Sequence, residues 1–178
     1  MKPAEPLSLQ EMRYREAADR YGGELSRFVA GYERDAARRQ ELLQDVHLSL
    51  WRSMAGFREQ CSLRTWTYRV AHNVCVLHVQ RGVRSLDRHL VSLEEAEAIA
   101  DERESVSSVD RRLDLERVLK LVHRLAPVDR EVMLLYLEDL DAASIGEVTG
   151  LSPANVATRV HRIKALLGER LRGKERER

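Results

Sequence analysis

The hydrophobic positions of this chain recur at steps of three and four, a spacing that predicts amphipathic helices. The segment from about 36 to 56 carries one such stripe: Leu43, Val46, Leu50, Met54 and Phe57. The segment from about 63 to 80 carries a second: Leu63, Trp66, Val70, Val74 and Leu77. Ser62 directly precedes the second segment and can cap its first turn. No run shows sustained period-two alternation, so no strand is predicted.

Helices are also predicted near both ends of the chain. A first helical stretch lies within 8–34, where Gly22-Gly23 is expected to interrupt it because glycine is a poor helix former. Helical periodicity returns later with five apolar positions: Leu115, Val118, Leu119, Val122 and Leu125. Three further helices are expected at about 128–138, 142–149 and 153–172.

Between these two helical halves the periodicity is lost. Residues 82–109 are charged and rich in serine, and they include an acidic cluster: Glu94, Glu95, Glu97, Asp101, Glu102 and Glu104. Such a composition cannot bury enough apolar area to offset the entropy lost on ordering, so a flexible linker is predicted. The predicted fold class is all-α, with two small helical domains at 8–82 and 111–172 joined by an acidic linker at 83–110.

The formal net charge of +1 hides an uneven distribution of charge. Residues 91–118 hold 9 acidic and 4 basic side chains, whereas residues 1–90 hold 15 basic and 11 acidic ones. In the last predicted helix a single acid, Glu169, accompanies five basic residues: Arg159, Arg162, Lys164, Arg170 and Arg172. Phosphate affinity depends on local cationic density, so the low net charge does not exclude a nucleic-acid partner.

The composition disfavours membrane, secreted and metal-binding proteins. No stretch approaches the ~18 consecutive apolar residues that a membrane span needs. The first six residues lack the apolar core of a signal peptide. Cys61 and Cys75 stand alone, without a CxxC pair or a metal-ligand spacing. We therefore expect a reduced, cytoplasmic protein with no cofactor, no metal and no membrane insertion.

The run from 141 to 164 carries the most informative local pattern. Asp141 and Ser152 are each placed to cap a helix, and Pro153 falls in a first turn, where its missing N–H costs nothing. Gly150 stands where the first helix ends, a position that often requires a positive φ. The inward face of this short helix consists of Ile145 and Val148, and Leu151 can pack between the two helices. The pattern predicts a helix-turn-helix.

The second helix of this motif has two distinct faces. One is an apolar stripe for the core: Val156, Val160, Ile163, Leu167 and Leu171. The other is polar: Asn155, Thr158, Arg159 and Arg162. Asn and Arg side chains read adenine and guanine edges, while Thr and Arg also bind phosphates. DNA binding is therefore predicted, with an amphipathic helix bearing a solvated basic face as the alternative.

The C-terminal half resembles region four of the extracytoplasmic-function sigma factors, which are small alternative sigma subunits of bacterial RNA polymerase. Residues 125–140 resemble the family's Leu-Pro, Arg-Glu-Val and apolar run, and residues 162–167 resemble its Arg-x-x-x-x-Leu ending. The resemblance implies that the polar face of the second helix lies in the major groove of the −35 element. It also implies contact with the β flap of the polymerase.

Residues 14–81 are similar to region two of the same family. The segment 41–46 resembles the family's acidic-Leu-x-Gln-Glu-x, and 66–73 resembles its Trp-x-x-x-Ile-Ala-x-Asn. The two halves together cover about 120 of the 178 residues, in the order the family has them. This order identifies the chain as a member of the sigma-70 family.

One predicted face of the helix at 36–56 mixes charges, an amide and a leucine: Glu41, Gln44, Asp45, Leu48 and Arg52. These residues lie away from the apolar stripe, at helical spacing. A solvated face with one exposed leucine would account for them. The family resemblance instead implies docking on the β′ clamp coiled coil of the RNA polymerase core.

The segment 57–62 falls between the two predicted helices of region two. In the family this loop captures a flipped base of the melted −10 element. The resemblance implies that role for Arg58, Glu59, Gln60 and Ser62, and it implies that the following helix presents Arg69, Asn73 and Arg81 to the same DNA strand. A polar turn between helices is the alternative. Trp66 and Tyr68 could stack on bases, but Trp66 lies on the apolar stripe, which favours core packing.

Two other classes of protein fit the sequence less well. An enzyme is disfavoured because the six histidines are scattered and no phosphate loop or nucleophile elbow appears. A stand-alone repressor would have no need of segments 41–46 and 66–73. We therefore predict a non-enzymatic sigma factor that binds core polymerase and promoter DNA, with an anti-sigma factor as a further candidate partner.

Overall fold

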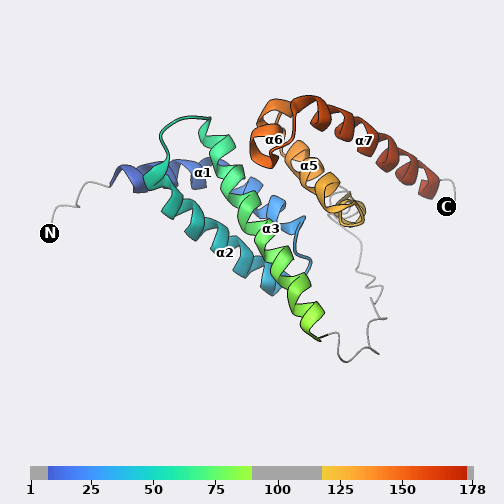
Figure 1. Ribbon diagram of the computed structural model, residues 1–178, viewed down its shortest axis with the longest axis horizontal. Coiled ribbons are helices and arrows are strands. Elements are labelled where there is room, and N and C mark those ends of the chain that lie inside the picture. The colour runs from blue at the N-terminus through green and yellow to red at the C-terminus, as the bar shows by residue number, and fades with distance from the viewer. Residues whose placement is uncertain (1–7, 90–117, 176–178) are drawn as a thin grey trace.

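The computed structural model describes residues 8–89 and 118–175, and every regular element in these two ranges is a helix (Figure 1). The N-terminal half contains α1 (Leu9–Ala30), α2 (Ala36–Ser53), the short 3-10 helix η1 (Met54–Gly56) and α3 (Leu63–His89). The C-terminal half contains helical residues 118–122, then α5 (Pro127–Leu137), α6 (Ala142–Thr149) and α7 (Pro153–Glu175). The all-α prediction is confirmed. The predicted linker from residue 90 onward lies outside the described residues, as do Leu115 and the side chain of Leu171.

Helix α1 runs without a break through Gly22 and Gly23, so the predicted interruption is wrong. Ser8 caps the helix, since its hydroxyl accepts a hydrogen bond from the Glu11 N–H at 3.2 Å. Four side chains of α1 are buried: Ala17, Leu25, Phe28 and Val29. Burial of this face outweighs the roughly 1 kcal/mol that each glycine costs a helix.

The apolar stripe predicted for α2 is largely correct. Val46, Leu50, Met54 and Phe57 are buried, but the first core position is Leu42, while Leu43 is only half-buried. For α3 the predicted stripe is correct in part: Leu63, Trp66, Val70 and Val74 are partly buried against the core, whereas Leu77 is 50% exposed. The fully buried apolar side chains of α3 were not predicted: Tyr68, Ala71 and Cys75. Helix α3 contacts α1, α2 and α6, so its buried surface does not follow one seam.

Helix α3 is also longer than its hydrophobic pattern predicts. It continues through Gly82 to His89, nine residues past the expected end at about 80. Expected bounds of 128–138, 142–149 and 153–172 agree closely with α5, α6 and α7. Among the described helices, none combines the length and apolar character that crossing a membrane requires.

The two halves pack against each other, and α3 lies between α2 on one side and the C-terminal helices on the other (Figure 1). Gly31, directly after α1, allows a close approach of the two halves. A Cβ at Gly31 would collide with the buried side chain of Leu134 on α5. His123 Nε2 lies 3.2 Å from the carbonyl oxygen of Ala30. Two segments separated by about 90 residues therefore share one interface.

Candidate nucleic-acid and polymerase interfaces

The helix-turn-helix forms with the caps that its sequence predicts. Asp141 accepts a hydrogen bond from the Ser144 N–H at 2.7 Å, and these contacts lower the pKa of its carboxyl. Gly150 ends α6 with φ 80, in the left-handed region, and its N–H donates to the Gly146 carbonyl at 2.8 Å. Ser152 accepts from the Asn155 N–H at 3.3 Å and so caps α7. The turn is therefore fixed by local chemistry.

Gly146 is a further requirement of this turn that sequence reasoning missed. A Cβ at Gly146 would lie 2.6 Å from the carbonyl oxygen of Leu151, which is too close for any other residue without a shift of the backbone. Ile145 and Val148 are buried as predicted, and Leu151 packs against the core. The second helix is thereby held at a set angle to the first.

Helix α7 separates its two faces as predicted. Val156, Ile163 and Leu167 are buried and Val160 is half-buried, whereas Asn155, Thr158 and Arg162 are exposed and Arg159 is partly exposed. Asn155 Oδ1 accepts from Arg159 Nε at 2.7 Å, and the Thr158 hydroxyl donates to the Ala154 carbonyl. The four predicted DNA-facing residues thus form one polar surface.

Asp129 on α5 organises this surface, and sequence reasoning missed it. Its two carboxylate oxygens accept from Arg159 Nη1 and from Arg162 Nη2, the latter at 2.7 Å. The Asp129 side chain is 15% exposed, so it fixes both guanidinium groups from one side. The only sequence signal is an acid in the first turn of α5, which is common at helix N-termini for other reasons.

The five residues predicted to bind core polymerase share the exposed side of α2. Glu41, Gln44, Asp45 and Arg52 are exposed, and Leu48 is 46% exposed. Trp51 lies beside them in sequence and is 43% exposed, which adds a large apolar ring to this surface. An exposed tryptophan and leucine framed by charges have the composition of a protein–protein contact.

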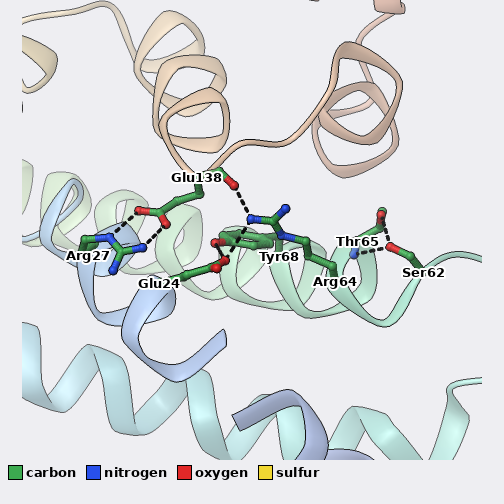
Figure 2. Close-up of polar contacts among 7 residues, drawn as sticks. All are labelled: Glu24, Arg27, Ser62, Arg64, Thr65, Tyr68 and Glu138. Atoms are coloured by element: carbon green, nitrogen blue, oxygen red, sulfur yellow. Dashed lines mark hydrogen bonds and ion pairs between the residues drawn. The ribbon is translucent and has the colours of Figure 1, made fainter. Parts of the chain in front are cut away.

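The loop between α2 and α3 presents the predicted base-binding residues to solvent. Arg58, Glu59, Gln60 and Ser62 are all exposed. Glu59 has φ 60, which is the left-handed region, and Gln60 Oε1 accepts from the Arg58 N–H at 3.1 Å. The Ser62 hydroxyl accepts from the Thr65 N–H at 3.0 Å and so caps α3, as predicted (Figure 2).

The aromatic side chains of α3 belong to the core and not to an open surface. Tyr68 is fully buried and its hydroxyl donates to Glu24 at 2.8 Å, and burial raises its pKa well above the ordinary value. Trp66 packs against Phe57, with ring centroids 5.3 Å apart, and donates to the Ser53 hydroxyl. Core packing for Trp66 is therefore confirmed, and Tyr68 is not accessible to a base.

The cationic residues of α3 lie partly under the C-terminal half. Asn73 and Arg81 are exposed, but Arg69 Nη2 lies 3.7 Å from the Glu147 carboxylate of α6. His72 is buried, with its Nε2 3.2 Å from Glu131 of α5. The structure therefore does not bring Arg69, Asn73 and Arg81 together on one open face.

Glu138, just after α5, forms the centre of this interdomain contact (Figure 2). Its carboxylate accepts from Arg27 Nε at 3.3 Å and from Arg27 Nη2 at 2.8 Å, and its carbonyl accepts from Arg64. Arg64 also donates to Glu24 at 3.1 Å. Burial raises the pKa of the Glu138 carboxyl, and the hydrogen bonds from Arg27 only partly offset that effect. Glu138 of the C-terminal half thus accepts hydrogen bonds from two basic side chains of the N-terminal half, Arg27 and Arg64.

Several histidine and cysteine side chains lie in or near the core of the part of the chain that the structure describes. There, no group of three or more His, Cys, Asp or Glu side chains is placed to hold a metal ion. Both cysteines are free thiols, and burial raises the pKa of Cys75. Burial also lowers the pKa of His47, whose Nδ1 lies 3.2 Å from the Tyr14 hydroxyl. Cys75 is therefore a core side chain, whereas Cys61 and His47 are only partly buried.

Family comparison decides between the classes of DNA-binding protein. A family model described as sigma-70 region 2 matches residues 17–85, and one described as sigma-70, region 4 matches residues 115–167. The chain belongs to the sigma-70 family. The match at region 2 is decisive because a helix-turn-helix alone occurs in many repressors. The family membership that the motifs predicted is confirmed. The prediction of an alternative sigma factor for promoter-specific transcription is confirmed with it.

Curated relatives of this sigma factor are themselves sigma factors. The RNA polymerase sigma-H factor of Pseudomonas aeruginosa is 27% identical over 143 residues, which is 78% of this chain and 70% of that protein. The sigma factor YlaC of Bacillus subtilis is 26% identical over 142 residues, covering 78% and 81%. The extracytoplasmic-function sigma factor SigW of Bacillus subtilis is 23% identical and covers 75% of each chain.

A solved structure of CnrH in complex with the cytosolic domain of CnrY has the same fold as this sigma factor. It matches with a TM-score of 0.63 at 22% identity, and it covers 90% of this chain and 88% of that one. The region 2 match, residues 17–85, falls within α1–α3, and the region 4 match, residues 115–167, covers α5, α6 and most of α7.

Proposed function

We propose that this sigma factor binds the RNA polymerase core through the exposed side of α2 and directs initiation at promoters with a −35 and a −10 element. The observation that supports it best is the surface of Leu48 and Trp51, framed by Glu41, Asp45 and Arg52. Large apolar side chains with a polar rim suit docking on a helical partner such as the β′ clamp coiled coil. The sigma factor would bind the polymerase in the cytoplasm.

Region 4 would place α7 in the major groove of the −35 element. Its exposed polar face offers an amide and two guanidinium groups, which suit the edges of adenine and guanine: Asn155, Arg159 and Arg162. Thr158 and the capped start of α7 suit phosphates. Asp129 would hold the two arginines in position before they meet DNA.

A different side of region 4 would receive the β flap. An apolar groove of about 570 Å³ lies between α5, α6 and α7. It is lined by apolar side chains that include Leu140, Ile145, Val156 and Val160, with Lys164 at its border. Because these α7 residues do not overlap the DNA-facing set, the flap and the −35 element could be bound together.

Region 2 would hold the melted −10 strand. The exposed loop residues Arg58, Glu59 and Gln60 offer donors and acceptors for one unpaired base, with Asn73 and Arg81 further along α3. Single-strand capture needs no covalent chemistry, because binding of unpaired bases and phosphates offsets the cost of opening the duplex. Ser62 would contribute mainly by capping α3.

The two halves must separate for both elements to be read. The −35 and −10 elements lie roughly 25 base pairs apart, or about 85 Å at a rise of ~3.4 Å per pair. Arg69 on α3 and Glu147 on α6 are only 3.7 Å apart. The described halves are joined by 28 residues, 90–117, and a chain of that length spans at most ~95 Å. Core binding would therefore exchange the interdomain contacts for contacts with polymerase and DNA.

An anti-sigma factor is a second proposed partner. The fold neighbour CnrH is known from its complex with the cytosolic domain of CnrY, so a domain of that kind is a candidate ligand for this chain.

Run-off transcription with purified core polymerase tests the proposed function. The sigma factor should co-elute with core enzyme, and sequencing of the transcripts should give start sites that share one −35 and one −10 sequence. Core polymerase alone provides the control. Tight binding to duplex DNA without association with core enzyme would contradict the proposal and would favour a stand-alone repressor.

A further inference from the structure

Arg13 on α1 reaches the loop between α2 and α3, although the two are more than 40 residues apart in sequence. Its Nη1 donates to the Phe57 carbonyl at 2.6 Å, and its Nη2 donates to Glu59 Oε1 at 2.8 Å. One planar guanidinium therefore connects the backbone at the start of the loop with a side chain at its middle.

The position of Arg13 is fixed by its surroundings. Its guanidinium lies 5.3 Å from the centroid of the Phe57 ring, and Phe57 is itself buried against Trp66. The Arg13 side chain is only 20% exposed, whereas Glu59 is 73% exposed. The contact is thus anchored on the core side and offers its other end to solvent, unlike an ion pair between two mobile surface side chains.

The loop needs such an anchor because of its backbone conformation. Glu59 has φ 60, which glutamate rarely adopts because its Cβ crowds the backbone. The surrounding structure must hold such a residue in place. The bond to the Phe57 carbonyl and the pair with Glu59 fix the positions on both sides of Arg58. Arg58 and Gln60 are in turn linked by the hydrogen bond from the Arg58 N–H.

We propose that Arg13 is a positioning residue for −10 recognition: it holds the loop 57–60 in the one conformation that accepts an unpaired base. The proposal rests on the proposed function, since the loop is there assigned to the melted −10 strand. Arg13 does not contact the base. It binds one oxygen of Glu59 and partly neutralises that carboxylate, which lowers its repulsion of the DNA phosphates.

The variants for the test are chosen to separate positioning from folding. Arg13→Ala removes both donors, while Arg13→Lys keeps the charge near Glu59 but cannot bridge to the Phe57 carbonyl with the same geometry. Arg15→Ala is the matched control, because Arg15 is an exposed arginine of the same helix that pairs with Glu11 at 2.8 Å and with no other acid among the described residues. Thermal unfolding of each variant reports its stability.

The measurement is run-off transcription from a library in which the −10 element is randomised and the −35 element is constant. Wild type and Arg15→Ala should select the same −10 sequence. Arg13→Ala should reduce the preference for the best base at one position of that sequence by about five- to tenfold, with core binding unchanged. Arg13→Lys should give a smaller reduction at the same position.

Two results would overturn the inference while leaving the proposed function in place. In the first, wild type selects a −10 sequence and both Arg13 variants select the same one with equal preference. In the second, Arg13→Ala lowers transcription equally from every library member in proportion to a loss of thermal stability, and Arg13→Lys restores both. If wild type selects no −10 sequence at all, the proposed function itself fails, and Arg13 has no such role.

Discussion

Glu138 of region 4 accepts two hydrogen bonds from Arg27 of region 2, a residue 111 positions earlier in the chain. The Glu138 side chain is 7% exposed and that of Arg27 is 49% exposed, so the carboxylate is buried and the guanidinium remains partly in water. Burying a carboxylate is costly unless it is paired, which makes this contact sensitive to the charge at position 138. The Glu138–Arg27 pair is one of several contacts between the two halves in this closed arrangement, beside the packing of Leu134 against Gly31 and the contact of His123 with Ala30.

Substitution of Glu138 should control the distance between the halves. Glu138→Lys places a cation against Arg27 and Arg64, so the halves should separate and the radius of gyration should increase. Glu138→Gln keeps a hydrogen-bond acceptor without a buried charge, so the closed arrangement should persist. Small-angle X-ray scattering of the free protein would measure both. Identical scattering from Glu138→Lys and wild type would contradict a role for this pair.

The pH dependence of the closed arrangement follows from the pKa of the Glu138 carboxyl. Its pKa is raised in the closed arrangement, mainly by burial, and returns to its ordinary value when the halves separate. The closed form therefore binds a proton more tightly, so lowering the pH through the raised pKa should favour closure and raising it should favour opening. A fluorescence-transfer pair on the two halves would follow this change, and Glu138→Gln should remove the Glu138 contribution.

Gly22 within α1 and Gly31 directly after it should respond in opposite ways to the same substitution. A Cβ at Gly22 meets nothing within 4 Å, so Gly22→Ala should raise the free energy of unfolding by about 0.5–1 kcal/mol. A Cβ at Gly31 collides with Leu134, so Gly31→Ala should weaken the packing of the halves by ~1–3 kcal/mol. Urea denaturation would compare them. Stabilisation by Gly31→Ala would mean that Leu134 moves aside freely.

Asp129 should set the sequence selectivity of α7. Asp129→Asn removes the carboxylate that anchors the two arginines, and with it one negative charge beside the DNA. Binding to random duplex DNA should therefore strengthen. The ratio of −35 to random affinity should fall, because Arg159 and Arg162 are no longer pre-oriented. Fluorescence anisotropy at several salt concentrations would measure both. Asp139→Asn is the control, since Asp139 is exposed at φ 56, which asparagine tolerates.

The two proposed surfaces should be separable by mutation. Arg159→Ala should weaken −35 binding by about 1–3 kcal/mol and leave core association unchanged. Leu48→Asp should weaken core association and leave −35 binding unchanged, because it places a charge on the apolar part of the α2 surface. Co-elution with core enzyme and anisotropy on duplex DNA would score each variant. Equal loss of both activities in either variant would contradict the division of labour.

Much of region 4 was predictable because its signals are local. The caps Asp141 and Ser152, the left-handed Gly150 and the two faces of α7 each depend on residues within a few positions of one another. The exposed side of α2 was predictable for the same reason. The core face of α3 was not, because the hydrophobic pattern records burial against one partner and α3 has several.

By itself, then, the sequence determined the helices, their order, the turn of the helix-turn-helix and the family. Short-range hydrogen bonding and hydrophobic spacing are sufficient for these features. Only the tertiary structure decided which side chains meet across long separations: Asp129 with the α7 arginines, Arg13 with the 57–60 loop, and Glu138 with Arg27. Such contacts depend on how packed helices place residues far apart in the chain, which no local pattern encodes.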